Sequence, residues 1–122
     1  MDKVLLDSNI IIYATRNKAL RNKLSSFRLL VSEISRLEVF GYFNLEPDEE
    51  LALELFFKNI SPVNISTAVI NEAILIRKGK SISTADAIIA ASAKNFNIPL
   101  YTHNTKDFKH IKDIVVIDPL QK

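Results

Sequence analysis

The feature of this chain that most constrains its fold is a set of short apolar runs in which polar and apolar residues do not alternate. Val4–Leu6 is the clearest of them, and we read four further segments in the same way: 29–31, 60–65, 98–101 and 114–117. A strand with one face in water alternates, whereas a strand covered on both faces is apolar throughout. We therefore expect strands buried within a parallel sheet, with Pro62 and Pro99 at strand starts, where a missing N–H is tolerated.

Helical patterns fill the stretches between these expected strands. Pro47 followed by three acids is typical of a helix N-terminus, and Gly79 marks the end of another helix. The segments predicted as helices are 9–14, 18–27, 35–42, 47–58, 66–78 and 83–95. Alternating strands and helices predict an α/β fold with helices on both faces of a central, mostly parallel sheet. The length is typical of one domain, so we expect a single domain over residues 1–122.

Composition excludes several kinds of chemistry. The chain has no cysteine, which excludes disulfides, thiolate catalysis and cysteine-based zinc sites. Its first residues lack the apolar stretch of a signal peptide, and no segment is apolar for long enough to span a bilayer. We therefore expect a cytoplasmic protein without membrane contact. The net charge of +2 is a weak indication of a polyanionic partner, as is a basic cluster near the end: Lys106, Lys109, His110 and Lys112.

Four acids stand at corresponding places in this pattern. Asp7 ends the first expected strand, and Asp107 follows the fourth. Glu38 and Asp86 lie near the starts of two expected helices. The carboxyl ends of parallel strands, and the helix starts that follow them, meet at one edge of a sheet. Four like charges there would repel each other, so their convergence predicts a cation between them. Oxygen ligands without cysteine favour Mg²⁺ or Mn²⁺.

Each acid also has a simpler interpretation, as a stabiliser of local backbone. Asp7 would cap the helix that follows it. Glu38 and Asp86 each stand three residues after a serine, which is the spacing of a capping box. Asp107 would stabilise a turn together with Asn104. Capping is the commoner role for a single acid, but it requires four coincidences at one edge, and helix N-termini favour carboxylates in either case.

Other polar residues near the motifs are weaker candidates. Asn9 is the residue we favour for orienting a carboxylate or a water, while the role of Ser8 stays open. His103 and His110 are poor candidates as ligands, because they lie seven residues apart in an expected loop region with no cysteine nearby.

Four segments resemble, in order, the motifs of the PIN domain and, within that family, of the VapC-type toxins. They are 4–13 around Asp7, 35–42 around Glu38, 83–93 around Asp86 and 102–108 around Asp107, followed by a closing segment at 115–119. The third is the most specific match. The order and spacing span Val4 to Pro119, so nearly the whole chain is covered. The resemblance implies a PIN-like three-layer sandwich.

The resemblance also implies an activity and partners. It implies Mg²⁺-dependent endonucleolytic cleavage of RNA, a homodimer, and inhibition by a small VapB-type antitoxin. The family varies in whether its fourth acid stands at the place of Asn104 or of Asp107. Here only Asp107 carries a charge, and Asn104 is kept as an uncharged site residue.

The residues fit a hydrolysis without a covalent intermediate. Asp7, Glu38 and Asp86 would hold one Mg²⁺ (or Mn²⁺), with Asp107 helping directly or through water. No Ser, Cys or His nucleophile stands in the motifs. A metal ion lowers the pKa of a bound water and neutralises charge on the transition state. Two basic residues flank the acids and are candidates for phosphate contacts, with solvated surface charge as an equal alternative: Arg36 and Lys106.

Three alternatives use a similar arrangement of acids. A receiver-like phosphoacceptor domain requires adjacent acids after the first strand and an aspartate after the third, and neither is present. A non-catalytic RNA-binding or scaffold domain would lack one of the acids, whereas all four are present. A DNA-directed nuclease with the same acidic centre cannot be separated by motifs, because the 2′-OH is read by local contacts.

The N-terminal half carries more apolar surface than one small sheet can cover. Two runs, 10–13 and 39–43, are joined by Leu53, Phe56 and Phe57. Part of this surface must be core, and the excess predicts a dimer face or a groove for a partner helix. The resemblance implies both, with an antitoxin segment in the groove and one of its basic side chains reaching the acids.

Overall fold

Strand β1 (Lys3–Leu6) lies at the centre of the sheet, and the chain adds strands first on one side of it and then on the other. The computed structural model describes residues 2–121. The strand order is β3-β2-β1-β4-β5, and all neighbours are parallel. The remaining strands are β2 (Arg28–Ser32), β3 (Ser61–Val63), β4 (Leu100–Tyr101) and β5 (Val116–Ile117). The predicted parallel sheet is confirmed, although three of its strands are shorter than the apolar runs.

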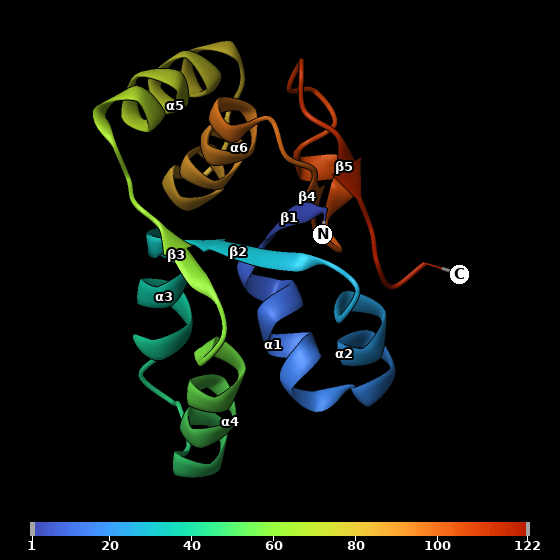
Figure 1. Ribbon diagram of the computed structural model, residues 1–122. Coiled ribbons are helices and arrows are strands. Elements are labelled where there is room, and N and C mark those ends of the chain that lie inside the picture. Colours follow the sequence, from blue (N-terminus) through green and yellow to red (C-terminus); the bar gives the residue numbers. More distant parts are fainter. Residues whose placement is uncertain (1, 122) are drawn as a thin grey trace.

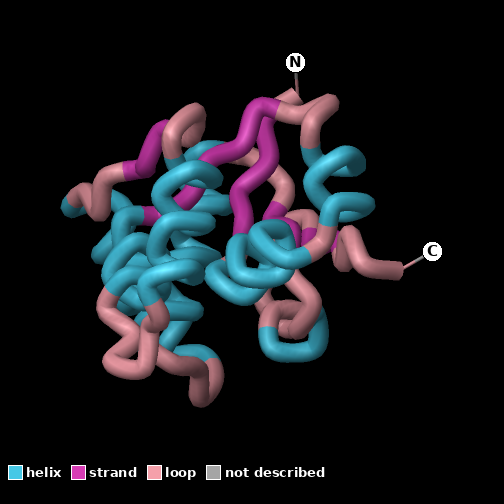
Figure 2. The backbone as a smooth tube through the Cα atoms, turned by 90° about the horizontal axis from the view of Figure 1, so that it is seen from below, coloured by secondary structure: helices cyan, strands magenta, loops and turns pink. Residues whose placement is uncertain are grey.

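Helices cover both faces of the sheet (Figure 1), and the view from below shows them, in cyan, around the strands (Figure 2). They are α1 (Ser8–Arg16), α2 (Lys18–Leu24), α3 (Glu33–Phe40), α4 (Pro47–Phe57), α5 (Thr67–Gly79), α6 (Thr84–Phe96) and the short 3₁₀ helix η1 (Thr105–Asp107). Helices α1 to α4 lie on one face, whereas α6 lies on the other with α5 packed against it (Figure 1). The predicted α/β layering is therefore confirmed. No helix within residues 2–121 is both long and apolar enough to cross a membrane.

The central strand shows why its sequence is apolar throughout. Val4 and Leu6 point into the core formed with α1, α2 and α4, whereas Leu5 points into the core formed with α6. All three side chains are at most 1% exposed. Because successive strand residues face opposite sides, a strand covered on both sides has no position for a polar side chain.

Two local predictions were wrong. Helix α3 begins at Glu33 rather than Ser35, because the side chain of Ser32 accepts a hydrogen bond from the backbone N–H of Ile34 and caps the helix there. Pro62 is the second residue of β3 rather than its start. It is tolerated because β3 is an edge strand, where one side of the backbone needs no strand partner. Pro99 directly precedes β4, as expected.

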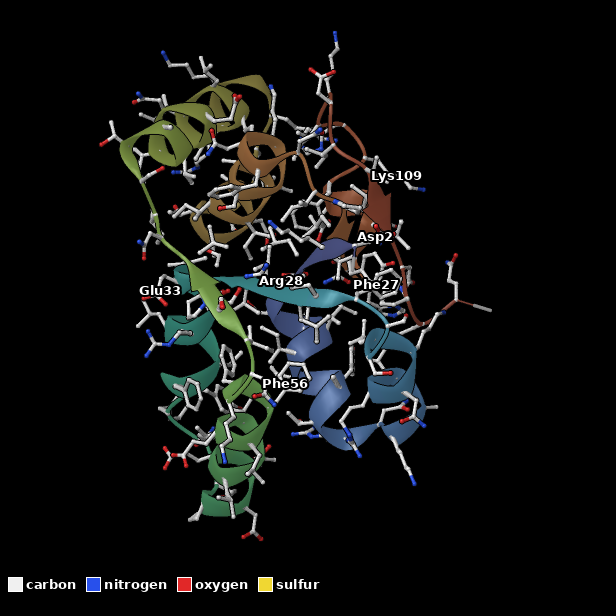
Figure 3. The ribbon with its side chains drawn as sticks, in the orientation of Figure 1. Asp2, Phe27, Arg28, Glu33, Phe56 and Lys109 are labelled. Atoms are coloured by element: carbon white, nitrogen blue, oxygen red, sulfur yellow. The ribbon has the colours of Figure 1, made fainter. Side chains whose placement is uncertain are left out.

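The strand order creates a topological switch point beside β1. The chain continues from β1 to β2 and β3 on one side, and β4 and β5 occupy the other side. Figure 3 labels Arg28 at the start of β2 and Glu33 just beyond its end, which fixes the carboxyl edge of the sheet. Open α/β sheets bind their ligands at this edge, next to the switch point. Asp7, which follows β1, therefore stands where this fold most favours a site.

Candidate active site

Asp7 is the buried centre of the carboxyl edge. It is 4% exposed. Its Oδ1 accepts a hydrogen bond from the backbone N–H of Ser8 (2.8 Å), and its Oδ2 accepts one from the hydroxyl of Thr102 (2.8 Å). Asp7 is also the N-cap of α1, so the capping interpretation and a site role are compatible in this residue. Each carboxylate oxygen retains lone pairs for a further ligand.

Thr102 is a site residue that the sequence analysis did not single out. Its side chain is fully buried just beyond β4, on the other side of the switch point from β2. Its hydroxyl donates to Asp7 and accepts from the backbone N–H of Asn104 (3.1 Å). One hydroxyl therefore fixes a carboxylate and the start of the loop that leads to Asp107. Its only sequence signal is its place directly after an apolar strand, within the segment that resembles the fourth motif.

Ser8 connects the first acid with the second. Its hydroxyl donates to Oε1 of Glu38 (2.6 Å) and lies 3.0 Å from the hydroxyl of Ser35. Ser8 and Ser35 are buried, whereas Glu38 is exposed. The role of Ser8, left open by the sequence, is therefore to join the start of α1 to the middle of α3. Because α3 begins at Glu33, Glu38 lies in its second turn and cannot close a capping box.

Asp86 lies in the first turn of α6, but its carboxylate does not complete a capping box with Ser83. The side chain of Ser83 accepts a hydrogen bond from the backbone N–H of Asp86 (3.1 Å). Within residues 2–121, no reciprocal bond runs from the backbone N–H of Ser83 to the Asp86 carboxylate. Such a reciprocal pair does form at α4, between Glu46 and Glu49. The Asp86 carboxylate therefore makes no capping hydrogen bond within residues 2–121, although its spacing from Ser83 would allow one.

Asp107 ends the short helix η1, and Asn104 immediately precedes that helix. The backbone N–H of Asp107 donates to the backbone carbonyl of Asn104 (3.0 Å), so the turn is closed by main-chain atoms. The side chain of Asn104 does not cap η1. The turn therefore does not depend on either side chain, and the exposed carboxylate of Asp107 is free for other contacts.

The four acids influence one another electrostatically. Burial raises the pKa of Asp7, and the charges of Glu38 and Asp107 raise it further, against the lowering effect of its hydrogen bonds with Thr102 and Ser8. Burial also raises the pKa of Asp86, with added contributions from the charges of Asp7, Glu38 and Asp107. Carboxyl groups from four separate parts of the chain thus repel each other at one edge of the sheet.

The donor set fits a hard divalent cation. All four groups are carboxylates, and a positive ion between them would relieve the repulsion that adds to burial in raising the pKa values of Asp7 and Asp86. Among residues 2–121, no group of three or more His, Cys, Asp or Glu side chains is placed to hold a metal ion. Mg²⁺ does not require such a group, because it commonly keeps several waters and binds through one or two carboxylates.

The remaining candidates differ in their surroundings. Asn9 is exposed in the first turn of α1, one residue beyond Ser8. Arg36 forms an ion pair with Glu33, with its Nη1 3.0 Å from both carboxylate oxygens. Arg36 is thus engaged within its own helix. Lys106 lines a polar hollow that also contains Asp86 and Asp107.

An apolar groove lies on the Glu38 side of the acids. Its volume is about 250 Å³, and it is lined by residues of α1, α3, α4 and the α3–α4 connection: Ile12, Thr15, Arg16, Glu38, Val39, Tyr42, Leu45, Glu49 and Leu53. Arg16 and Glu49 form an ion pair across it. Tyr42 and its neighbour Phe43 are 54% and 89% exposed. The predicted excess of apolar surface is therefore present here, while Ile10, Ile11 and other members of the same runs form core.

A family model described as PIN domain matches residues 4–114 of this chain. The tRNA(fMet)-specific endonuclease VapC of Salmonella typhimurium is 30% identical over 130 residues, which cover 97% of this chain and 98% of that protein. Ribonuclease VapC1 of Haemophilus influenzae strain R2866 is also 30% identical, over 90% of this chain and 92% of that protein.

Solved structures agree with this fold over the whole chain. The structure of DNA-bound VapBC from Salmonella typhimurium matches with a TM-score of 0.82 at 25% identity, covering 98% of this chain and 99% of that chain. The structure of VapBC-1 from nontypeable Haemophilus influenzae matches with a TM-score of 0.78 at 28% identity, with the same coverage. The similarity therefore includes every element that carries one of the four acids.

Proposed function

Since this chain belongs to the PIN-domain family, in its VapC-type branch, we propose that it is a metal-dependent endoribonuclease and the toxin of a toxin–antitoxin pair. The observation that carries the proposal is the electrostatic coupling of four carboxyl groups beside the switch point of a parallel sheet. Relatives named as ribonucleases over nearly the whole chain support the reaction class.

The carboxylates of Asp7, Glu38 and Asp86 would hold Mg²⁺ or Mn²⁺, in part through bound waters, with Asp107 taking part directly or through water. When bound, the ion supplies an activated water and neutralises charge on the phosphate that is attacked. The chain's own hydroxyls position the ligands: Thr102 holds Asp7, and Ser8 holds Glu38. We propose that water, and not a side chain, attacks the phosphate, so the products would form by direct hydrolysis.

The apolar groove is the proposed binding site for an antitoxin segment. Solved structures of VapBC contain a similar chain together with its antitoxin. An amphipathic helix would cover Val39 and Tyr42, and a basic side chain on it would reach Glu38, which lines the same groove. We also propose that the chain forms a homodimer and acts in the cytoplasm.

The nuclease proposal is tested with a labelled single-stranded RNA and a DNA strand of matched sequence. We expect internal cleavage of the RNA with Mg²⁺ or Mn²⁺, little turnover with Ca²⁺, and no cleavage in excess EDTA. Cleavage that continues in EDTA would reject the metal-dependent reaction. Preferential cleavage of the DNA would favour the DNA-directed alternative, and no cleavage of either strand would favour a scaffold domain.

The toxin proposal is tested in a cell. Expression of the chain alone should slow growth, and co-expression with the short neighbouring gene should restore it, with the two products purifying together. The Asp7→Asn variant should lose toxicity yet keep the partner, because the groove is mostly apolar. A harmless wild-type chain that captures no neighbouring product would reject the toxin role even if nuclease activity is found.

A further inference from the structure

Two adjoining hollows begin at Asp86 and Asp107, whereas the apolar groove begins at Glu38. The first, of about 330 Å³, contains Asp86 and Asp107 of the acidic centre together with Lys106. The second, of about 380 Å³, leads away from the acids past Lys112. Lys80 and His110 line both hollows, so they mark the path from one to the other. We call the two together the lysine-lined hollow.

The charges along this hollow become more positive with distance from the acids. Near the acids, two carboxylates face two lysines, Lys80 and Lys106. Farther away, Lys94 is paired with Glu72 (3.1 Å). That pairing leaves Lys80 and Lys112 as the excess charge of the outer part. Both are exposed, and neither forms an ion pair within residues 2–121. The outer part is thus positive where it leaves an acidic centre.

His110 adds an independent observation. Both of its ring nitrogens are buried and have no hydrogen-bond partner among residues 2–121. One of these nitrogens carries a hydrogen in every protonation state of the ring. A buried donor without an acceptor destabilises a fold, so such a group calls for an explanation. Because the residue lines both hollows, it lies beside a ligand bound in either one.

We propose that the lysine-lined hollow binds the backbone phosphates of single-stranded RNA next to the scissile phosphate, through Lys80, Lys112 and His110. The inference rests on the proposed nuclease function, which places the scissile phosphate at the acids. Lysines contact phosphates as point charges, without reading sequence. The lining near the acids is mostly polar, whereas the lining of the outer part is mostly apolar and carries Lys80 and Lys112, so the match with a polyanion depends on these two charges.

The test measures binding in EDTA, where the proposed reaction does not occur. The dissociation constant of a fluorescently labelled single-stranded RNA is followed by anisotropy at several salt concentrations. The double variant Lys80→Gln/Lys112→Gln should bind on the order of tenfold more weakly. The slope of the logarithm of affinity against the logarithm of salt concentration is negative, and its magnitude should fall by about 1.4, since two single-strand phosphate contacts are lost.

The matched control is Lys58→Gln. Lys58 is exposed at the end of α4, outside the lysine-lined hollow, and its loss removes the same charge as either single variant, Lys80→Gln or Lys112→Gln. Equal weakening by Lys58→Gln and by either hollow lysine would overturn the proposal, because the effect would then be one of net charge. Unchanged RNA binding in the double variant would also overturn it. So would loss of the antitoxin together with unchanged RNA binding, which would make the hollow a protein-binding surface.

His110→Leu tests whether His110 contacts the RNA or is only a buried polar group that destabilises the fold. It should raise the melting temperature, since an unpartnered buried polar group is removed, and should also weaken RNA binding severalfold. A higher melting temperature with unchanged RNA affinity would remove His110 from the binding site. If the wild-type chain cleaves RNA and the double variant binds and cleaves it equally well, only this inference fails. If the wild-type chain neither binds nor cleaves RNA, the proposed function fails first.

Discussion

The surfaces on the two sides of the acidic centre (Asp7, Glu38, Asp86 and Asp107) differ in chemistry, although both adjoin these carboxylates. On the side of Glu38, α1, α3 and α4 form a mostly apolar groove crossed by one ion pair, Arg16–Glu49. On the side of Asp86 and Asp107, the lysine-lined hollow near the acids is mostly polar. A helix with an apolar face fits the first side, and a phosphate backbone fits the second.

In the two proposals above, this difference separates inhibition from substrate binding in space. An inhibitor that lies in the apolar groove reaches the acids through Glu38, whereas a nucleic acid on the other side reaches them through Asp86 and Asp107. The two ligands then compete only at the carboxylates. A change confined to one side should therefore leave the other ligand's binding intact, which makes the comparison testable.

The largest effect is expected at the shared centre, with Asp86→Asn. The variant should cleave RNA more than about 100-fold more slowly, beyond the loss usual for residues one step removed from a metal. Its metal-free fold should be as stable as the wild type or more stable, because one of several repelling charges is removed. Cleavage rate and thermal melting are measured on the same preparation, and Glu38→Gln should behave likewise. A less stable variant that cleaves RNA normally would return Asp86 to a capping role.

Thr102→Val tests the hydroxyl that holds the centre together. The change leaves Oδ2 of Asp7 and the backbone N–H of Asn104 without their partner. We expect a 10- to 100-fold loss of cleavage and a loss of about 1–3 kcal/mol in the free energy of unfolding. Thr102→Ser keeps the hydroxyl and is the control. If valine and serine variants are equally active, the hydrogen bond to Asp7 does not position the carboxylate.

Tyr42→Glu tests whether the apolar groove acts independently of the lysine-lined hollow. Tyr42 is more than half exposed, so the change should cost the fold little. The affinity for the antitoxin should fall about 30-fold or more, because an aromatic anchor of the groove is replaced by a charge. RNA cleavage should stay within about twofold of the wild type. Parallel losses of antitoxin binding and cleavage would show that the two sides are not separate.

The smallest effect is expected in the pH dependence of stability. Asp7 and Asp86 have raised pKa values in the folded chain, so the folded state binds more protons than the unfolded state between the ordinary and the raised values. The contribution of these groups to the free energy of unfolding therefore falls as pH rises through that window, and recovers as pH falls. The free energy of unfolding is measured by urea unfolding in EDTA at several pH values. Its slope against pH should be less negative for Asp86→Asn than for the wild type. Identical slopes would show that burial and the neighbouring charges do not raise the pKa of Asp86 in the folded chain.

The local predictions that failed share a cause. The sequence placed a helix start at Ser35, because a serine three residues before an acid fits a capping box. Ser32 competes for the same role and caps α3 first, which moves Glu38 into the second turn. Pro62 was placed at a strand start, but the edge position of β3 allows it inside the strand. In each case the deciding factor was a neighbour that the local pattern does not contain.

The sequence by itself determined the parallel sheet buried on both sides and the positions of four acids at its carboxyl edge. Those features depend on local patterns, since an apolar run and the residue that ends it stand side by side in the chain. Only the tertiary structure decided that Thr102 holds Asp7 across 95 residues, and that Ser8 reaches Glu38 across 30. It also decided which side of the centre is apolar and which carries the unpaired lysines. Hydrogen bonds, burial and the pKa values that follow from them depend on which distant segments pack together, and no local pattern specifies that.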